Sequence, residues 1–148
     1  MAIVSIIICG LLLDQFSKIL TLKNLAVNQS IPLVKNIFHL TLVFNRGAAF
    51  GIFKNYTVFF IIAAGLAILF IILNLRKDRK INLSNISLAL ILSGACGNLI
   101  DRVRFGFVVD FLDFRFWPVF NIADSLISLG ALLLAFSIFR SKDASHNL

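Results

Sequence analysis

The chain has 148 residues, of which 59% are hydrophobic, and its mean hydropathy is +0.97. A soluble domain of this length cannot bury so much apolar surface, so the composition predicts a single integral membrane domain, residues 1–148. The formal net charge of +7 would also suit a nucleic-acid binder, but the charges lie between apolar runs and form no continuous basic face. Positively charged loops of a membrane protein explain them better.

Four apolar runs approach the roughly 20 residues that a helix needs to cross a bilayer. The first, residues 2–20, has no charged start and no small-residue cleavage site, so we interpret it as a retained span rather than a removable signal. The others cover residues 57–75, 83–102 and 120–139. The fold class expected is therefore an all-α membrane protein with four transmembrane helices.

The connections between the runs differ in kind. Residues 21–56 hold β-branched and aromatic stretches, which predict a small β element at the membrane surface between the first two spans. Residues 103–119 mix aromatic side chains with charges, which is typical of an interfacial segment. Residues 76–80 read RKDRK and form a tight, strongly basic turn.

The basic turn predicts the topology. The positive-inside rule places residues 76–80 in the cytoplasm, and four spans then put both termini there and both long connections outside. The polar residues of the first, third and fourth spans all lie near the outer ends. They therefore converge on one layer, opposite the basic turn: Asp14, Gln15, Lys18, Asn98, Asp101, Arg102, Asn121 and Asp124.

Asn121 and Asp124 open the fourth span. They are three residues apart, so they share a helix face. One interpretation is structural: Asn121 caps the helix and Asp124 is stabilised by the helix dipole. The other is functional, because ionisable residues at membrane depth usually serve a function.

Polar residues of the first and third spans and of the segment between the first two spans allow the same two interpretations, structural and functional. Asn98, Asp101 and Arg102 share a face of the third span, where structural roles are favoured for Asp101 and for Arg102 as a charged support. Asp14 and Lys18 are four residues apart, in the order that favours an ion pair. The stretch FNRGAAFG at 44–51 has small residues around Asn45, which would let the backbone pass close to a ligand or a strand.

Asp110 lies in GFVVDFLDF, just before the fourth span. That placement brings it to the membrane surface where Asp124 lies, whereas Asp113 is interpreted as an ordinary interfacial acid. Two carboxylates at a low-dielectric boundary cannot both ionise comfortably, so one should keep a proton while the other stays charged. Such a pair could activate a water molecule against a carbonyl and protonate the departing group.

Other chemistries find less support in the sequence. Cys9 and Cys96 are far apart in apolar stretches, His39 and His146 are isolated, and no serine lies in a nucleophile elbow. We therefore expect no metal and no cofactor. A proton-coupled transporter or channel subunit using intramembrane Asp residues is the alternative, although a relay needs polar groups spread across the membrane. A structural scaffold would tolerate loss of either Asp.

Four blocks in order give the chain a family resemblance. DQFSK at 14–18, FNRGAAFG at 44–51, SGACGNLIDRVRFGFVVDFLDF at 93–114 and FNIADSLISLG at 120–130 resemble the lipoprotein signal peptidase (signal peptidase II) family. The set covers nearly the whole chain. Ser93 departs from the pattern, since glycine is frequent there in the family.

The resemblance implies a membrane-embedded aspartyl endopeptidase of the bacterial inner membrane. It would remove the signal peptide of a prolipoprotein by cutting before the diacylglyceryl-modified cysteine, and globomycin-type cyclic peptides would inhibit it. By motif match Asp110 and Asp124 are the catalytic pair, and a functional monomer is expected. The supporting residues implied are Asp14, Lys18, Asn45, Gly47, Asn98, Arg102 and Asn121.

Overall fold

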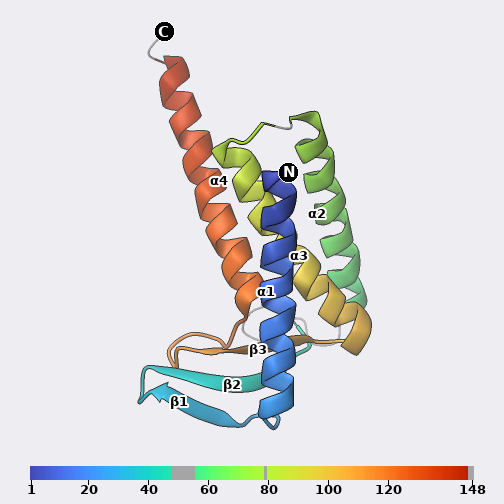
Figure 1. Ribbon diagram of the computed structural model, residues 1–148, viewed down its shortest axis with the longest axis vertical. Coiled ribbons are helices and arrows are strands. Elements are labelled where there is room, and N and C mark those ends of the chain that lie inside the picture. The colour runs from blue at the N-terminus through green and yellow to red at the C-terminus, as the bar shows by residue number, and fades with distance from the viewer. Residues whose placement is uncertain (48–55, 79, 147–148) are drawn as a thin grey trace.

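The computed structural model describes residues 1–47, 56–78 and 80–146. Four helices form a bundle with a small sheet at one end (Figure 1). The helices are α1 (Ala2–Asn24), α2 (Thr57–Lys77), α3 (Leu83–Phe105) and α4 (Ile122–His146), and the strands are β1 (Ser30–Val34), β2 (Phe38–Asn45) and β3 (Val108–Asp113). All four helices are long and apolar enough to cross a membrane, which confirms the predicted helices and β element.

The helix ends have local causes. α3 runs three residues past its predicted end and stops at Gly106, whose φ of 77° is a left-handed conformation that favours glycine. α4 begins at Ile122 rather than at residue 120, because the side chain of Asn121 accepts a hydrogen bond from the backbone N–H of Asp124 at 2.9 Å. The structural interpretation of Asn121 as a helix cap is therefore correct.

The helix α3 is the centre of the bundle, since α1, α2 and α4 all pack against it. Glycines on α3 allow this close packing. A Cβ atom at Gly97 would collide with the carboxylate of Asp14, and one at Gly94 would collide with the backbone carbonyl of Ala123. The outer helix α2 is different: only 6% of its most apolar window is buried. Its sides are therefore available to lipid.

The sheet is antiparallel in the order β1-β2-β3. β1 is an exposed edge strand, whereas β3 is buried along nearly its whole length. Leu42 of β2 and Val109 of β3 form a small apolar core with Leu25, and Phe44 stacks on Phe107 with ring centroids 4.1 Å apart. The aromatic residues after α3 thus fasten a third strand, which the sequence pattern alone did not specify.

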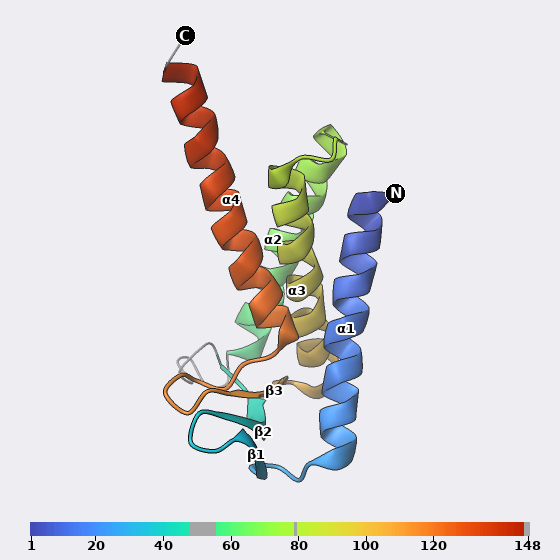
Figure 2. The same cartoon turned by 60° about the vertical axis from the view of Figure 1, so that its left-hand side comes forward.

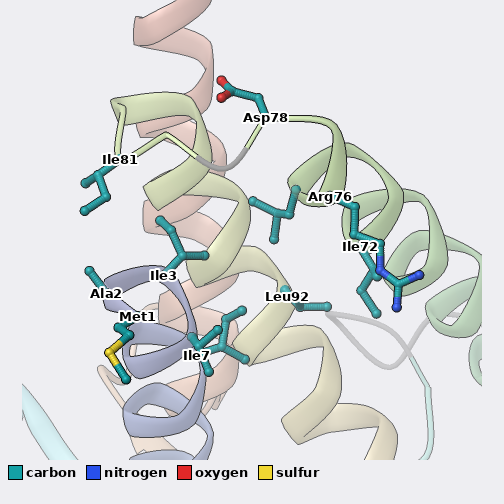
Figure 3. Close-up of a pocket in the computed structure, with 11 residues that line it drawn as sticks. Met1, Ala2, Ile3, Ile7, Ile72, Arg76, Asp78, Ile81 and Leu92 are labelled. Atoms are coloured by element: carbon teal, nitrogen blue, oxygen red, sulfur yellow. The ribbon is translucent and has the colours of Figure 1, made fainter.

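The two ends of the bundle are unlike each other. The turn between α2 and α3 and the N-terminal end of α1 lie opposite the sheet, in both views (Figures 1 and 2). A pocket of about 500 Å³ lies at that turn end. It is lined mainly by aliphatic side chains of α1, α2 and α3, with Arg76 and Asp78 (Figure 3). The polar residues that the sequence placed in one layer lie away from this pocket, toward the sheet.

Candidate functional site

The strand β3 and the first turn of α4 each contribute one carboxylate to the candidate site. Asp110 lies within β3 and is 1% exposed. Asp124 lies in the first turn of α4, where its carboxylate accepts a hydrogen bond from the backbone N–H of Asn121 at 3.3 Å. Since Asn121 caps the same turn, the two residues hold each other reciprocally, as in a capping box. The helix start thereby fixes the direction of Asp124.

Asn121 also reaches the other carboxylate. Its side-chain N–H donates to Oδ1 of Asp110 at 2.6 Å. Oδ1 of Asn98 at 3.1 Å and the carbonyl oxygen of Val109 at 3.3 Å lie within reach of the same nitrogen. An amide nitrogen carries two hydrogens, so at most two of these three acceptors are served well at once, and the shortest contact is to Asp110. Asn121 therefore contacts both carboxylates.

Two further asparagines complete the polar shell. The side chain of Asn45, at the end of β2, donates to Oδ2 of Asp110 at 2.9 Å. The side chain of Asn98, on α3, donates to Oδ1 of Asp124 at 2.8 Å. The backbone N–H of Gly47 donates to Oδ1 of Asn45 at 3.0 Å, which fixes the orientation of that amide. Three parts of the fold, namely β2, α3 and the start of α4, thus supply donors to the two acids.

The environment changes the acidity of Asp110. Burial and then the negative charge of Asp124 raise the pKa of Asp110 from its ordinary value of 3.8 to about 7, against the hydrogen bonds from Asn45 and Asn121 and the charge of Lys18, which lower it. A carboxyl with this pKa keeps its proton at neutral pH in part of the molecules. The arrangement can therefore offer a proton donor beside a charged carboxylate.

The cations near the site bind other partners. The ammonium of Lys18 lies 2.9 Å from a carboxylate oxygen of Asp14 and 2.9 Å from one of Asp101, which confirms the predicted pair of Asp14 and Lys18. It also donates to Oδ1 of Asn98 at 3.0 Å. Lys18 is thereby connected to Asp124 through the amide of Asn98.

Arg102 contacts the backbone rather than an acid. Its guanidinium donates to the carbonyl oxygens of Gly47 at 3.3 Å and Asn98 at 3.4 Å, and it lies 5.1 Å from the centre of the Phe60 ring. Among the residues described, it forms no ion pair. The sequence had suggested a charge-holding support, and the contacts add that Arg102 links α2, α3 and the end of β2.

Two residues matter more than their sequence patterns suggested. Asp101, interpreted as structural, binds both Lys18 and the backbone of β3. Gln15 lies between Asp14 and Asp101. No pattern could have revealed the backbone contact, although the spacing of Asp14, Gln15 and Lys18 put all three at one end of α1. Asp113, by contrast, binds Thr41 and Arg115, away from the pair.

An aromatic pocket opens beside Asp124. Its volume is about 400 Å³, within the usual range for ligand sites, and its walls are mostly aromatic and hydroxyl side chains: Phe114, Phe116, Trp117, Phe120, Asp124, Ser125 and Ser128. Among the described residues, no three His, Cys, Asp or Glu side chains form a group able to hold a metal ion. The site therefore offers carboxylates and amides next to an apolar opening.

The fold is that of a bacterial membrane enzyme. One solved structure of that description, determined by the in meso method at 2.3 Å resolution, matches with a TM-score of 0.90 and 29% identity, covering 95% of this chain and 89% of that chain. A second one, at 1.9 Å, gives a TM-score of 0.84 and 30% identity, covering 93% and 92%.

Comparison of the sequence with known proteins identifies the family more closely than the fold does. A profile of the family described as Signal peptidase (SPase) II matches residues 6–140. Proteins named lipoprotein signal peptidase are similar: that of Caldanaerobacter subterraneus is 52% identical over 84% of this chain and 86% of its own length. That of Clostridioides difficile is 49% identical, with 96% and 99% covered, and that of Halothermothrix orenii 46%, with 93% and 94% covered. The chain belongs to the signal peptidase II family.

Family membership confirms the class predicted from the motifs, a membrane peptidase with four spanning helices. It does not favour the transporter alternative. The arrangement of polar groups agrees with this, because the carboxylates and asparagines of the candidate site hydrogen-bond one another in one cluster that includes residues of β2 and β3, rather than being spread along the bundle.

Proposed function

We propose that this chain removes the signal peptide from prolipoproteins, cutting before the diacylglyceryl-modified cysteine, with Asp110 and Asp124 as the catalytic pair. The names of its relatives support the substrate. The observation that carries the catalytic assignment is the position of Asn121, which hydrogen-bonds both Asp110 and Asp124 and so holds two acids from different elements around one small space.

In the proposed reaction the pair shares one proton. The protonated carboxyl donates a hydrogen bond to the oxygen of the scissile carbonyl, and the charged carboxylate takes a proton from a water molecule, whose oxygen attacks the carbonyl carbon. The C–N bond then breaks as the departing amine receives a proton from the pair. The raised pKa of Asp110 supports one retained proton near neutral pH, and the two groups titrate as a unit.

The surroundings of the pair suit a lipidated substrate. The pocket beside Asp124 is walled by Phe114, Phe116, Trp117 and Phe120, which can contact acyl chains or an apolar peptide. Globomycin-type cyclic peptides would occupy the same space. Because all the groups of the site come from one chain, a monomer suffices for the reaction.

The proposed orientation follows from charge. The turn between α2 and α3 carries Arg76, Lys77 and Lys80, and by the positive-inside rule this turn and both termini face the cytoplasm. The candidate site, nearer the sheet, then lies toward the extracytoplasmic face of the inner membrane. A substrate whose modified cysteine lies at the outer interface would meet the site at that depth.

The test is conversion of a diacylglyceryl-modified prolipoprotein by the full chain in membranes. Asp110→Asn and Asp124→Asn should each lower kcat by about 10²- to 10⁴-fold, the usual contribution of a general acid or base. Asp113→Asn is the matched control, because Asp113 lies on the same strand but binds Thr41 and Arg115. Its activity should match the wild type. Full activity in either of the first two variants would remove the catalytic assignment.

A further inference from the structure

A second pair of acids lies beside the proposed catalytic pair. Asp14 on α1 and Asp101 on α3 are 0% and 1% exposed, and each lies 2.9 Å from the ammonium of Lys18. The third contact of that ammonium is with Asn98. An ammonium has three N–H groups, so Lys18 is fully used in joining these three side chains.

The remaining contacts of the two acids point toward the proposed catalytic residues. Asp14 accepts a hydrogen bond at 2.8 Å from the backbone N–H of Ala123, the residue before Asp124. Asp101 accepts one at 3.0 Å from the backbone N–H of Val109, the residue before Asp110. Asp14 of α1 and Asp101 of α3 thus each hold the backbone N–H of the residue just before one of the two proposed catalytic residues.

Gln15 closes the connection between the two acids. Its side-chain nitrogen lies 3.2 Å from Oδ2 of Asp14, from Oδ1 of Asp101 and from the carbonyl oxygen of Gly97. A continuous polar path therefore runs from Ala123 through Asp14, Lys18 and Asp101 to Val109. All its side chains are buried or half-buried, so water competes little for these hydrogen bonds.

We propose that Asp101, joined to Asp14 through Lys18, is a positioning residue that fixes the distance between the backbones of β3 and α4, and with it the separation of the two catalytic carboxylates. The inference rests on the proposed function. A purely stabilising role would be satisfied by pairing with Lys18 alone, and buried ion pairs often contribute little net stability. A purely stabilising role does not explain why the two acids also bind the backbone beside each proposed catalytic residue.

The test compares Asp101→Ala with Asp101→Asn, measured as kcat and KM per folded enzyme on a diacylglyceryl-modified prolipoprotein in micelles. Both variants lose the charge, but the asparagine oxygen can still accept from Val109 and Lys18. Asp101→Ala should lower kcat by about 100-fold, the effect of a displacement near 1 Å, with KM unchanged. Asp101→Asn should recover most of that loss. A stabilising role alone predicts reduced thermal stability in both variants with wild-type kcat in the folded fraction.

The matched control is Ser87→Ala, another buried polar residue of α3, whose hydroxyl donates to the carbonyl oxygen of Leu83 far from the site. Its kcat and KM should equal those of the wild type. If Asp101→Ala does not fold, Asp14→Ala and Asp14→Asn test the other attachment, at Ala123. Asp14→Ala should again lower kcat by about 100-fold, and Asp14→Asn should again recover most of that loss.

The outcomes separate the two proposals. Wild-type kcat in folded Asp101→Ala, or equal losses in the Ala and Asn variants, would overturn the positioning role while leaving the proposed function intact. Failure of the wild type to cut the prolipoprotein, or full activity of Asp110→Asn in the same assay, would instead overturn the proposed function.

Discussion

Two pairs of carboxylates lie side by side in this molecule, and their partners differ. Asp14 and Asp101 share the ammonium of Lys18, whereas Asp110 and Asp124 share the amides of Asn45, Asn98 and Asn121 and, among the described residues, form no ion pair. One cation offsets part of the negative charge of the first pair. Amides donate hydrogen bonds without balancing charge, so the second pair is left to hold a proton instead. A shared cation therefore distinguishes Asp14 and Asp101 from the proposed catalytic pair, whose partners are neutral amides.

The largest effect should come from removing the shared cation. Lys18→Met leaves two buried carboxylates without a counter-charge, and breaking a buried ion pair in this way costs about 3–5 kcal/mol. We expect a marked fall in the temperature of thermal unfolding in detergent micelles. Asp110→Asn should not lower that temperature, since it removes a buried acid that has no cation. Equal unfolding temperatures for Lys18→Met and the wild type would contradict the comparison.

A compensating change should reverse much of that fall. Adding Asp14→Asn and Asp101→Asn to Lys18→Met removes every charge of the cluster, and neutral replacement of buried ion clusters is often close to neutral in stability. The triple variant should therefore unfold at a higher temperature than Lys18→Met alone. Adding Asp110→Asn to Lys18→Met is the control, and it should give less recovery because Asp110 lies outside the Lys18 ion pairs.

If Asp110 and Asp124 are the catalytic pair, the proton that they share should appear in the pH dependence of activity. Because burial and the charge of Asp124 raise the pKa of Asp110 from 3.8 to about 7, the proton is retained up to that pH and lost above it. We expect kcat/KM to fall as the pH rises through about 7.

The coupling between the two acids can be tested separately. In Asp124→Asn the pKa of Asp110 should be lower than in the wild type, because a neighbouring negative charge is gone. Infrared absorption of the Asp110 carboxyl group would measure this pKa. A pKa of Asp110 that is unchanged in this variant would show that the two acids are not coupled.

The smallest effect is expected at an ion pair outside both acid pairs. Arg115 lies 3.0 Å from Asp113, but its side chain is 51% exposed, and exposed ion pairs contribute about 0–1 kcal/mol. Arg115→Gln should therefore change the unfolding temperature little and leave kcat unchanged. A large loss of activity would mean that the polar network of the sheet extends to the proposed catalytic pair.

Much of this arrangement could be predicted from the sequence. Hydropathy predicts the four helices, because each span must be long and apolar whatever it packs against. The pairing of Asp14 with Lys18 follows from their spacing on one helix. The capping of α4 by Asn121 follows from its position before an apolar run. Each of these depends on neighbours in the sequence or on the membrane itself.

The contacts of Asp110 could not be predicted in this way. A one-residue register shift between Leu40 and Val43 places Asp110 opposite Val43 on β2, and nothing in the local sequence specifies such a bulge. The attachment of Asp101 to Val109 uses a backbone N–H, which every residue but proline has, so no side-chain pattern marks it. Both features arise from strand register and helix packing, which are tertiary properties.

The hydrogen bond between Asp14 and Ala123 joins positions 109 residues apart. During synthesis the first helix leaves the ribosome long before the last one, and until α4 enters the bilayer neither Ala123 nor Asp124 is there to meet α1 or β3. A nascent chain with only three helices inserted therefore lacks the pair of Asp110 and Asp124, and the complete candidate site forms only once α4 is in place.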